Sequence, residues 1–306
     1  MQANLPNFLI VGSAKSGTTS LYEYLRQHPE VFMPYLKEPA FLAGSETAGR
    51  IDSIDEYRAL FSEAKNEKAL GEASTIYLPD PRSPRRIMDV LGTETRIIIV
   101  LRNPIDMTYS LWGHRKREGG EERSFMEAIE AGFKRYRGQN KKNALGIVGR
   151  LTTEQPYPYV FQARYANQVA NYKSEFDKVK VFIFEELFNN LESEFHHLCR
   201  FLRVNDSFRP DFERHNRAGM ARSEWVRSLI NDTYFLKEPI KALLPSATRI
   251  KIKSLLRAVN TRPKSLPELS SRDRSQLVEF FEDDVEKLED VLGRSVRKAW
   301  PDFQCG

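Results

Sequence analysis

The first residues that could do chemistry are a lysine and the two glycines that flank it near the start of the chain. Lys15 lies in the segment GSAKSGTTS, between the apolar residues 8–11 and a run of leucines and tyrosines at helical spacing. The apolar residues have the length and composition of a buried parallel strand. A glycine-containing turn between a strand and a helix offers unpaired amide N–H groups, and the lysine adds a full positive charge. The segment therefore predicts an anion-binding loop.

The spacing differs from that of a loop that binds nucleoside triphosphates. In that loop the lysine directly follows the last glycine and precedes serine or threonine. Here Thr18 follows Gly17, and Lys15 lies two residues before this glycine, on the strand side. A kinase that uses nucleoside triphosphates is the main alternative, since it would share the sheet topology. Against it, the later apolar strand ends in Arg102 and not in a magnesium-binding aspartate.

A second potential phosphate site combines an arginine at a strand end with a serine on the next helix. Arg102 follows the apolar residues 97–101, and Asn103 and Pro104 suit an N-cap and a first helical position. Ser110 lies roughly 9 Å further along that helix, at about 1.5 Å per residue. Together these side chains could hold one phosphate from two sides. Separately, they could be a salt-bridge partner and a neutral helix residue.

Two residues could accept a proton. Pro39 keeps Glu38 out of the helical conformation, just after a short predicted strand over residues 31–33, where open α/β sheets place their ligands. The alternative for Glu38 is a surface Lys-Glu pair in a turn. His114 could be a base or an acceptor contact, although a solvent-facing histidine among basic residues is the simpler interpretation.

In these segments the chain resembles a known family, the sulfotransferases that use 3′-phosphoadenylyl sulfate (PAPS). KSGTT resembles their 5′-phosphosulfate loop, and LRNP followed by Tyr-Ser resembles their 3′-phosphate segment. PNFLIVG, LYEYLRQHP and LKEPAF are closer to the bacterial and glycan-modifying branches than to the aryl or steroid branch. The resemblance is specific over residues 6–102, fair to residue 222 and generic beyond. It implies that the donor is held by Lys15, Ser16, Gly17, Thr18, Thr19, Arg102 and Ser110.

The resemblance also implies catalytic roles. The glutamate of the family's Lys-Glu-x-x-Phe segment, matched here by Glu38, takes the proton of the acceptor, while Lys15 stabilises the leaving group. Residues 215–222 look like the loop that closes over the nucleotide, with Arg222 reaching the 3′-phosphate. Glycan-modifying members have Glu-Lys-Ser/Thr where this chain has Ala73 in place of the lysine. This departure weakens the transfer of glycan specificity, so a small molecule, a glycan and a lipid all stay open as acceptors, as do hydroxyl and amine groups.

Composition limits the compartment and the partners. The 306 residues carry a net charge of +5, which fits a polyanionic ligand without choosing among nucleotide, nucleic acid, acidic glycan and membrane. Without a recognised reader motif, a nucleic-acid-binding protein is the weaker alternative. Two cysteines, Cys199 and Cys305, are too few for a disulfide framework or a metal cage. No apolar run approaches the ~18 residues that span a bilayer. We expect a cytoplasmic enzyme without a metal or a transmembrane segment; its oligomeric state stays open.

These residues require a parallel sheet whose strand ends meet. The strands that end near Val11, Thr75 and Arg102 would share one carboxyl edge. We therefore expect an α/β fold: a three-layer, P-loop-like domain with a central parallel sheet, helices on both faces and a helical C-terminal extension. A single domain would cover residues 1–306, with the nucleotide-binding and catalytic core in 1–222 and the helical part in 223–306.

Periodicity and composition place the remaining elements. Apolar residues at helical spacing predict helices over 52–63, 161–176, 185–202 and 277–292, and Trp300 is expected to pack as a plug near the C-terminus. Residues 138–159 contain glycines, prolines and few periodic apolar residues. Long loops of this kind in compact domains are commonly functional. This segment is therefore the predicted acceptor-binding loop.

Overall fold

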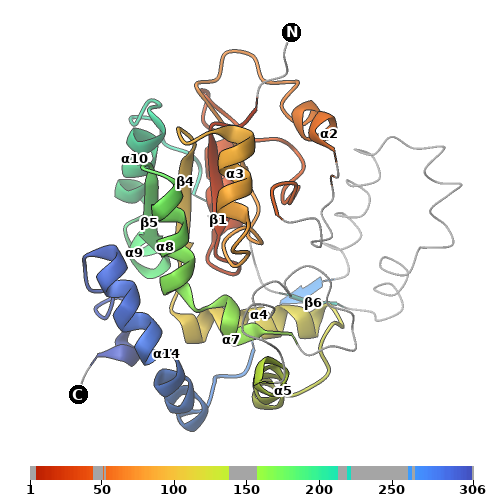
Figure 1. Ribbon diagram of the computed structural model, residues 1–306, viewed down its shortest axis with the longest axis vertical. Helices are drawn as coiled ribbons and strands as arrows, with labels where there is room; N and C mark the ends of the chain where they lie inside the picture. Colours follow the sequence, from red (N-terminus) through yellow and green to blue (C-terminus); the bar gives the residue numbers. More distant parts are fainter. Residues whose placement is uncertain are drawn as a thin grey trace, which may run out of the picture.

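A five-stranded parallel sheet forms the centre of the computed structural model (Figure 1). Its strands lie in the order β2-β3-β1-β4-β5. The structure describes residues 5–43, 51, 53–137, 157–212, 219–221, 261–263 and 266–304. The strands are β1 (Phe8–Gly12), β2 (Val31–Phe32), β3 (Ala69–Ala73), β4 (Arg96–Leu101) and β5 (Val179–Ile183). Because β3, β1 and β4 are parallel neighbours, their carboxyl ends meet at one edge, as the sequence predicted.

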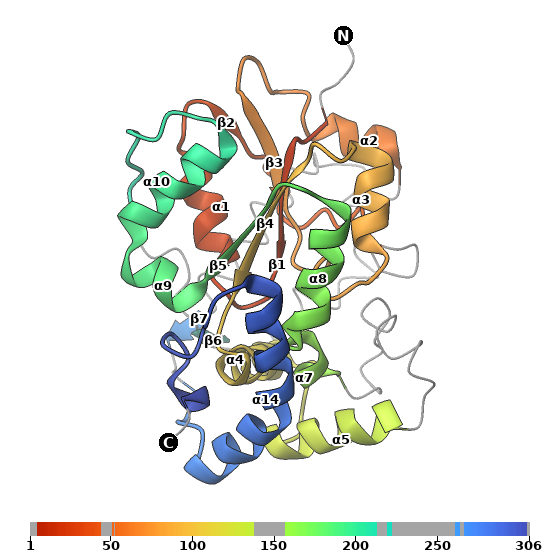
Figure 2. The same cartoon turned by 60° about the vertical axis from the view of Figure 1, so that its left-hand side comes forward.

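The sheet is buried on both faces, which explains the apolar runs in its strands. In β1, Phe8 and Ile10 pack on one side, and Leu9 and Val11 pack on the other. Figure 2 shows helices covering both sides, which confirms the expected three-layer α/β fold. One face carries α1 (Thr18–Arg26), α9 (Phe184–Asn189) and α10 (Leu191–Leu202). The other carries α2 (Ile54–Ala59), α3 (Ser83–Leu91) and α8 (Tyr165–Glu175).

Helix α4 (Pro104–Arg117) lies across the carboxyl end of the sheet, next to α5 (Phe125–Arg137) and α7 (Tyr159–Gln162) (Figure 1). It begins as predicted: the Asn103 side chain accepts the Ile105 N–H at 3.0 Å, and Pro104 takes the first helical position. The remaining elements are a short antiparallel pair, β6 (Gly219–Ala221) with β7 (Thr261–Pro263), then α14 (Ser271–Leu292) and the 3₁₀ turn η2 (Pro301–Phe303).

Two predicted helices are each broken in the structure. The helix expected over 161–176 is α7 followed by α8, since the Gln168 side chain donates to the Phe161 and Gln162 carbonyls and so satisfies the end of α7. The helix expected over 185–202 is α9 followed by α10. Here Asn190 ends the first helix, and its Nδ2 donates back to the Glu186 carbonyl at 3.2 Å.

Two other helices keep their predicted place with different bounds. Helix α2 is shorter than the predicted 52–63. Helix α14 begins six residues before Leu277, because the Ser270 side chain caps it by accepting the Asp273 N–H. The apolar stripe begins only at Leu277, so its periodicity did not show the first turns.

The C-terminal segment is fastened to the beginning of α4. Trp300 is fully buried, as predicted, and its Nε1 donates to Glu185 Oε2 at 2.9 Å. The other oxygen of Glu185 accepts the Asn103 N–H at 3.0 Å, and Asn103 Nδ2 donates to Asp302 Oδ2 at 2.7 Å. Asn103 directly follows Arg102, so these contacts fix the strand end that carries the predicted phosphate-binding arginine. The division into residues 1–222 and 223–306 stays a prediction.

Candidate functional site

The loop after β1 leaves backbone amides available for an anion. Gly17 is the N-cap of α1, and within the described part of the chain no side chain caps this helix end. Lys15 and Gly17 both have positive φ values, 60° and 76°. A helix N-terminus without a side-chain cap, preceded by such a turn, directs N–H groups toward a ligand.

Gly17 is required by both conformation and space. A Cβ atom there would lie 2.4 Å from Phe188 Cε2 and 3.1 Å from Phe184 Cε2, on α9. Any larger residue would collide with these rings and would also be strained at φ 76°. The glycine is therefore fixed by the close packing of α9 against the loop.

Internal hydrogen bonds hold the loop in shape. The Ser13 N–H donates to the Val100 carbonyl at 2.7 Å, which ties the loop to β4. The Ser13 and Ser16 hydroxyls are 2.5 Å apart and buried. Ser16, predicted to bind the donor, thus uses its hydroxyl within the loop and can offer its backbone amide to a ligand. Thr18 is buried at the start of α1, and Thr19 is half-buried beside it.

Positive charge converges on Lys15. Burial lowers the pKa of Lys15, and the charges of Arg117 and Arg102 lower it further, while Glu118 and Glu38 act in the opposite direction. The pKa of Lys15 is lowered in spite of these two carboxylates, so a further anion bound here would stabilise the charged form of the lysine. The electrostatics therefore favour an anionic ligand at Lys15.

No role was predicted for Arg117, although its spacing along α4 could have indicated one. Ser110, His114 and Arg117 follow one another at i, i+4 and i+7, which places them on one face of α4. The shared face and the effect of Arg117 on Lys15 bring this residue to the site.

Arg102 connects the two predicted phosphate sites. Its NH1 donates to the Lys15 carbonyl at 3.1 Å, and its Cζ lies 4.9 Å from the centre of the Phe184 ring. Its Nε is buried and has no hydrogen-bond partner within the described residues. Buried N–H groups of this kind are costly unless a ligand pairs with them, so the guanidinium suits a phosphate. Ser110 is half-buried, two turns along α4; its role stays a prediction.

Glu38 lies beside the end of β3. Its amide donates to the Ala73 carbonyl at 3.1 Å, and its Oε1 accepts Lys37 Nζ at 2.9 Å and Thr75 Oγ1 at 3.4 Å. The Lys-Glu pair of the simpler interpretation is therefore present. The Glu38 side chain is nevertheless 42% exposed and acts electrostatically on Lys15. A carboxylate that is accessible and close to the anion loop can take a proton from a bound acceptor.

His114 is partly exposed to solvent, as the simpler interpretation predicts, and it also interacts electrostatically with Lys15 of this region. Its side chain is 41% exposed, and its Nε2 lies 3.5 Å from Glu118 Oε2. Burial and the charge of Lys15 lower the pKa of His114. The imidazole is thus biased toward its neutral form beside the predicted anion loop and stays the alternative base.

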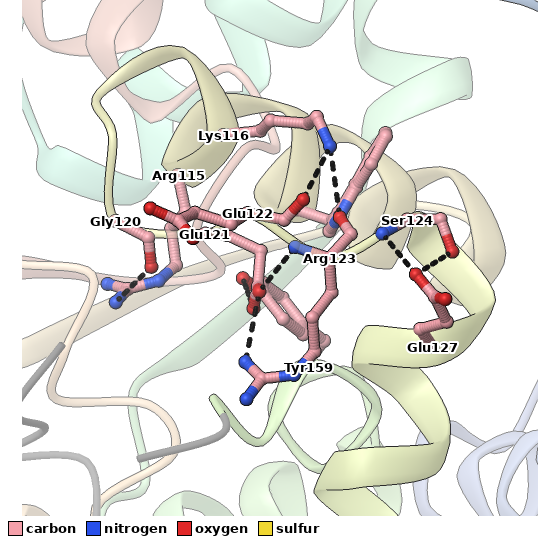
Figure 3. Close-up of polar contacts among 10 residues, drawn as sticks. Arg115, Lys116, Gly120, Glu121, Glu122, Arg123, Ser124, Glu127 and Tyr159 are labelled. Carbon is pink, nitrogen blue, oxygen red and sulfur yellow. Dashed lines mark hydrogen bonds and ion pairs between the residues drawn. The ribbon is translucent and has the colours of Figure 1, made fainter. Parts of the chain in front are cut away.

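The turn after α4 uses other basic residues to hold its own shape (Figure 3). Lys116 Nζ donates to the Glu122 and Arg123 carbonyls at 3.1 and 3.0 Å. The buried Glu121 carboxylate accepts the Tyr159 hydroxyl at 3.0 Å and the Arg123 N–H at 3.1 Å. The basic end of α4 therefore serves partly to fix the α4–α5 turn.

Glu72 on β3 carries a buried carboxyl group for which the sequence predicted no role beyond its place in a strand. It is fully buried and accepts three hydroxyls: Tyr77 at 2.7 Å, Ser74 at 2.8 Å and Tyr57 at 3.3 Å. Burial raises the pKa of Glu72 to about 7. An acidic residue inside an otherwise apolar strand was the signal that could have found it.

The raised pKa of Glu72 predicts a pH-dependent stability. Because the folded pKa lies above the unfolded value, the folded state binds more protons between about pH 4.5 and 7, and stability falls as pH rises through this window. From pH 5 to pH 8 the wild type should lose roughly 2 to 3 kcal/mol of unfolding free energy that Glu72→Gln does not lose. Urea unfolding of both proteins at the two pH values measures this, and parallel pH dependences would contradict the assignment.

Two predicted parts of the site lie outside the described residues: Arg222, and residues 138–156 of the predicted acceptor loop. Among the residues that the structure does describe, no group of three or more His, Cys, Asp or Glu side chains could hold a metal ion. In the same part of the chain, no helix has the length and hydropathy to cross a membrane.

The chain is similar to known sulfotransferases. A model of the sulfotransferase domain matches residues 5–235. The membrane-associated sulfotransferase kil1 of Dictyostelium discoideum is 30% identical over 131 residues, 41% of this chain and 27% of that protein. Human bifunctional heparan sulfate N-deacetylase/N-sulfotransferase 2 is 34% identical over 119 residues, 38% of this chain and 13% of that protein. The matches thus span about a quarter or less of these relatives.

A solved structure resembles the whole chain. The crystal structure of a sulfotransferase from Alicyclobacillus acidocaldarius superposes with a TM-score of 0.70 and 27% identity. The superposition covers 97% of this chain and 99% of the other. The two chains therefore share the same α/β fold.

Proposed function

Because this chain belongs to the sulfotransferase family, we propose that it moves a sulfuryl group from PAPS to a hydroxyl or amine of an acceptor. The observation that carries the choice of donor is the link between Arg102 and the anion loop. The guanidinium bonds to the Lys15 carbonyl and keeps a buried, unpaired Nε within the described residues. One nucleotide with phosphates at both the 5′ and the 3′ position of its ribose would occupy the anion loop and the site at Arg102.

The two sites would bind different groups of the same donor molecule. Lys15, Thr18, Thr19 and the amides of Ser16 and Gly17 would hold the 5′-phosphosulfate. At the other end, Arg102 and Ser110 would hold the 3′-phosphate, with Arg222 as a third partner by resemblance.

Glu38 would act on the acceptor. Its carboxylate would take the acceptor proton as the acceptor oxygen or nitrogen forms a bond to sulfur, in line with the S–O bond that breaks. Lys15 and the loop amides would stabilise the charge that develops on the bridging oxygen. PAPS supplies the sulfuryl group when bound and leaves as adenosine 3′,5′-bisphosphate (PAP). No step in this scheme uses a metal ion.

The acceptor would be a small molecule, a glycan or a lipid, and not a nucleic acid. One relative is a heparan sulfate N-deacetylase/N-sulfotransferase, which favours testing amino sugars and other glycans first. Ala73 argues against restricting the search to them, since the lysine of the glycan-modifying members is replaced here.

Mass spectrometry of acceptor pools would test the proposed function. The protein is incubated with PAPS and separate pools of phenols, alcohols, amines, oligosaccharides and lipids. We expect PAP release together with a product that is heavier by one SO₃ group in at least one pool. Sulfated product that forms equally with heat-inactivated protein, or release of PAP without any product, would contradict the proposal.

The variant Arg102→Ala tests whether Arg102 binds the 3′-phosphate of the nucleotide. Arg102→Ala should weaken PAP binding by roughly 10- to 100-fold, since charged hydrogen bonds contribute about 1.5 to 3 kcal/mol. Binding of adenosine 5′-monophosphate should change far less, because it lacks the 3′-phosphate. Arg85→Ala is the matched control, since Arg85 is an exposed arginine on α3. Calorimetry that shows equal losses for both nucleotides would place the 3′-phosphate elsewhere.

A further inference from the structure

The segment that carries Glu38 has an unusual backbone. Glu38 and Ala40 both have φ 57°, in the left-handed region that side chains other than glycine seldom adopt. Each such residue costs on the order of 1 kcal/mol and persists only when its surroundings fix it. The contacts of residues 38–42 should therefore show what determines the position of Glu38.

Three alternate amides of this segment donate to residues at the end of β3 or just after it. The Glu38 N–H donates to the Ala73 carbonyl at 3.1 Å. The Ala40 N–H donates to Ser74 Oγ at 3.1 Å, and the Leu42 N–H donates to the Tyr77 hydroxyl at 3.2 Å. Two of the three acceptors are thus side-chain hydroxyls, whose orientation depends on where their own protons go.

Both hydroxyls give their protons to the same buried carboxyl group. Ser74 Oγ donates to Glu72 Oε2 at 2.8 Å, and the Tyr77 hydroxyl donates to Oε1 at 2.7 Å. Because its single proton is directed at Glu72, each hydroxyl has lone pairs free to accept a hydrogen bond from a backbone N–H. Glu72 therefore determines that Ser74 and Tyr77 act as acceptors toward Ala40 and Leu42.

From these contacts we propose that Glu72 is a positioning residue for sulfuryl transfer, which holds Glu38 at the acceptor site through Ser74 and Tyr77. The proposal rests on the proposed function, and Glu72 itself would touch neither nucleotide nor acceptor. Burial of an ionisable carboxyl group costs folding free energy that a neutral residue would avoid. A role in aligning the reacting groups explains why the cost is tolerated, since small misplacements lower rates strongly.

Hydrogen exchange of Glu72→Gln tests this arrangement directly. The glutamine amide replaces one acceptor oxygen with a donor, so at least one hydroxyl must turn. At pH 8, where the wild-type Glu72 carboxyl group is ionised and accepts both hydroxyls, we expect the Ala40 and Leu42 amides to exchange about 10-fold faster in Glu72→Gln than in the wild type. Glu121→Gln is the matched control: it makes the same change in another buried carboxylate that accepts a tyrosine hydroxyl, in the α4–α5 turn (Figure 3). It should leave exchange in residues 38–42 unchanged.

Turnover separates positioning from general stability. With PAPS and the active acceptor pool, Glu72→Gln should lower kcat by roughly 10- to 100-fold, while calorimetry with PAP should show an almost unchanged Kd. Added to Glu38→Gln, the same substitution should cause no further loss, because the group that it positions is already removed. An additive loss, or an equal fall in kcat for Glu121→Gln, would overturn the positioning role.

The two proposals fail in different ways. A wild-type chain that binds no PAP and transfers no sulfuryl group would overturn the proposed function. Unaltered exchange at Ala40 and Leu42 in Glu72→Gln would overturn the role of Glu72, whatever the activity. Should that variant not fold, Ser74→Ala removes one of the two connections alone, and faster exchange is then expected at Ala40; unaltered exchange there would overturn the role as well.

Discussion

Lys15→Ala should reduce sulfuryl transfer by at least roughly 10²- to 10³-fold, the usual cost of removing one group that stabilises transition-state charge. The lysine is the cation of the anion loop, and it shares this corner with Arg102 and Arg117. Charge on the bridging oxygen grows as the sulfuryl group departs, so its loss should lower kcat more than it weakens nucleotide binding.

The structure makes Lys15→Ala a clean substitution. Arg102 bonds to the carbonyl of residue 15 and not to its side chain, so this contact survives in the variant. Single-turnover rates with PAPS measure the effect, and thermal unfolding verifies that the fold is kept. Lys65→Ala, which removes an exposed lysine on another surface, should behave as the wild type. Turnover of Lys15→Ala close to that of the control would remove Lys15 from the mechanism.

Glu38→Gln should lower kcat by roughly 10²- to 10⁴-fold, the range for loss of a general base. The substitution keeps the size of the side chain and removes its ability to take a proton. The main-chain bond from the Glu38 amide to the Ala73 carbonyl is unaffected by the change. Since the carboxylate would act on the acceptor, the Kd for PAP should stay nearly constant. Steady-state kinetics and calorimetry on the same protein measure both quantities.

His114 provides the competing outcome for the base. Its lowered pKa favours the neutral imidazole, which is the form that can accept a proton. If His114→Ala abolishes turnover while Glu38→Gln leaves it unchanged, the base is the histidine. Glu63→Gln, an exposed carboxyl group after α2, is the matched control for the loss of one negative charge.

The sheet was predictable because its strands are buried on both faces. Apolar runs such as residues 97–101 have few other interpretations, and glycine in the loop after β1 marked the turn that follows. The breaks at Asn190 and before Tyr165 were not predictable from periodicity. In both places side-chain amides, of Asn190 and Gln168, bond to helix-end carbonyls, and no proline or glycine marks the break.

The site was predictable only where one short segment carries the chemistry. Lys15 and Gly17 are neighbours in the sequence, so their joint use could be recognised. The connection from Glu72 to the segment of Glu38 depends on β3 lying beside residues 38–42. The sequence around Glu72 does not show which backbone amides donate hydrogen bonds to Ser74 and Tyr77. This part of the site could therefore be found only from the tertiary structure.

The central claim is that the loop of Lys15 and the guanidinium of Arg102 together bind a nucleotide with phosphates at both the 5′ and 3′ positions. Calorimetry of the wild-type protein with PAP and with ADP, in the absence of metal ions, tests it most directly. The account predicts that PAP binds at least about 10-fold more tightly, since the 3′-phosphate adds charged hydrogen bonds that ADP lacks. Equal affinity for the two nucleotides, or tighter binding of ADP, would contradict it.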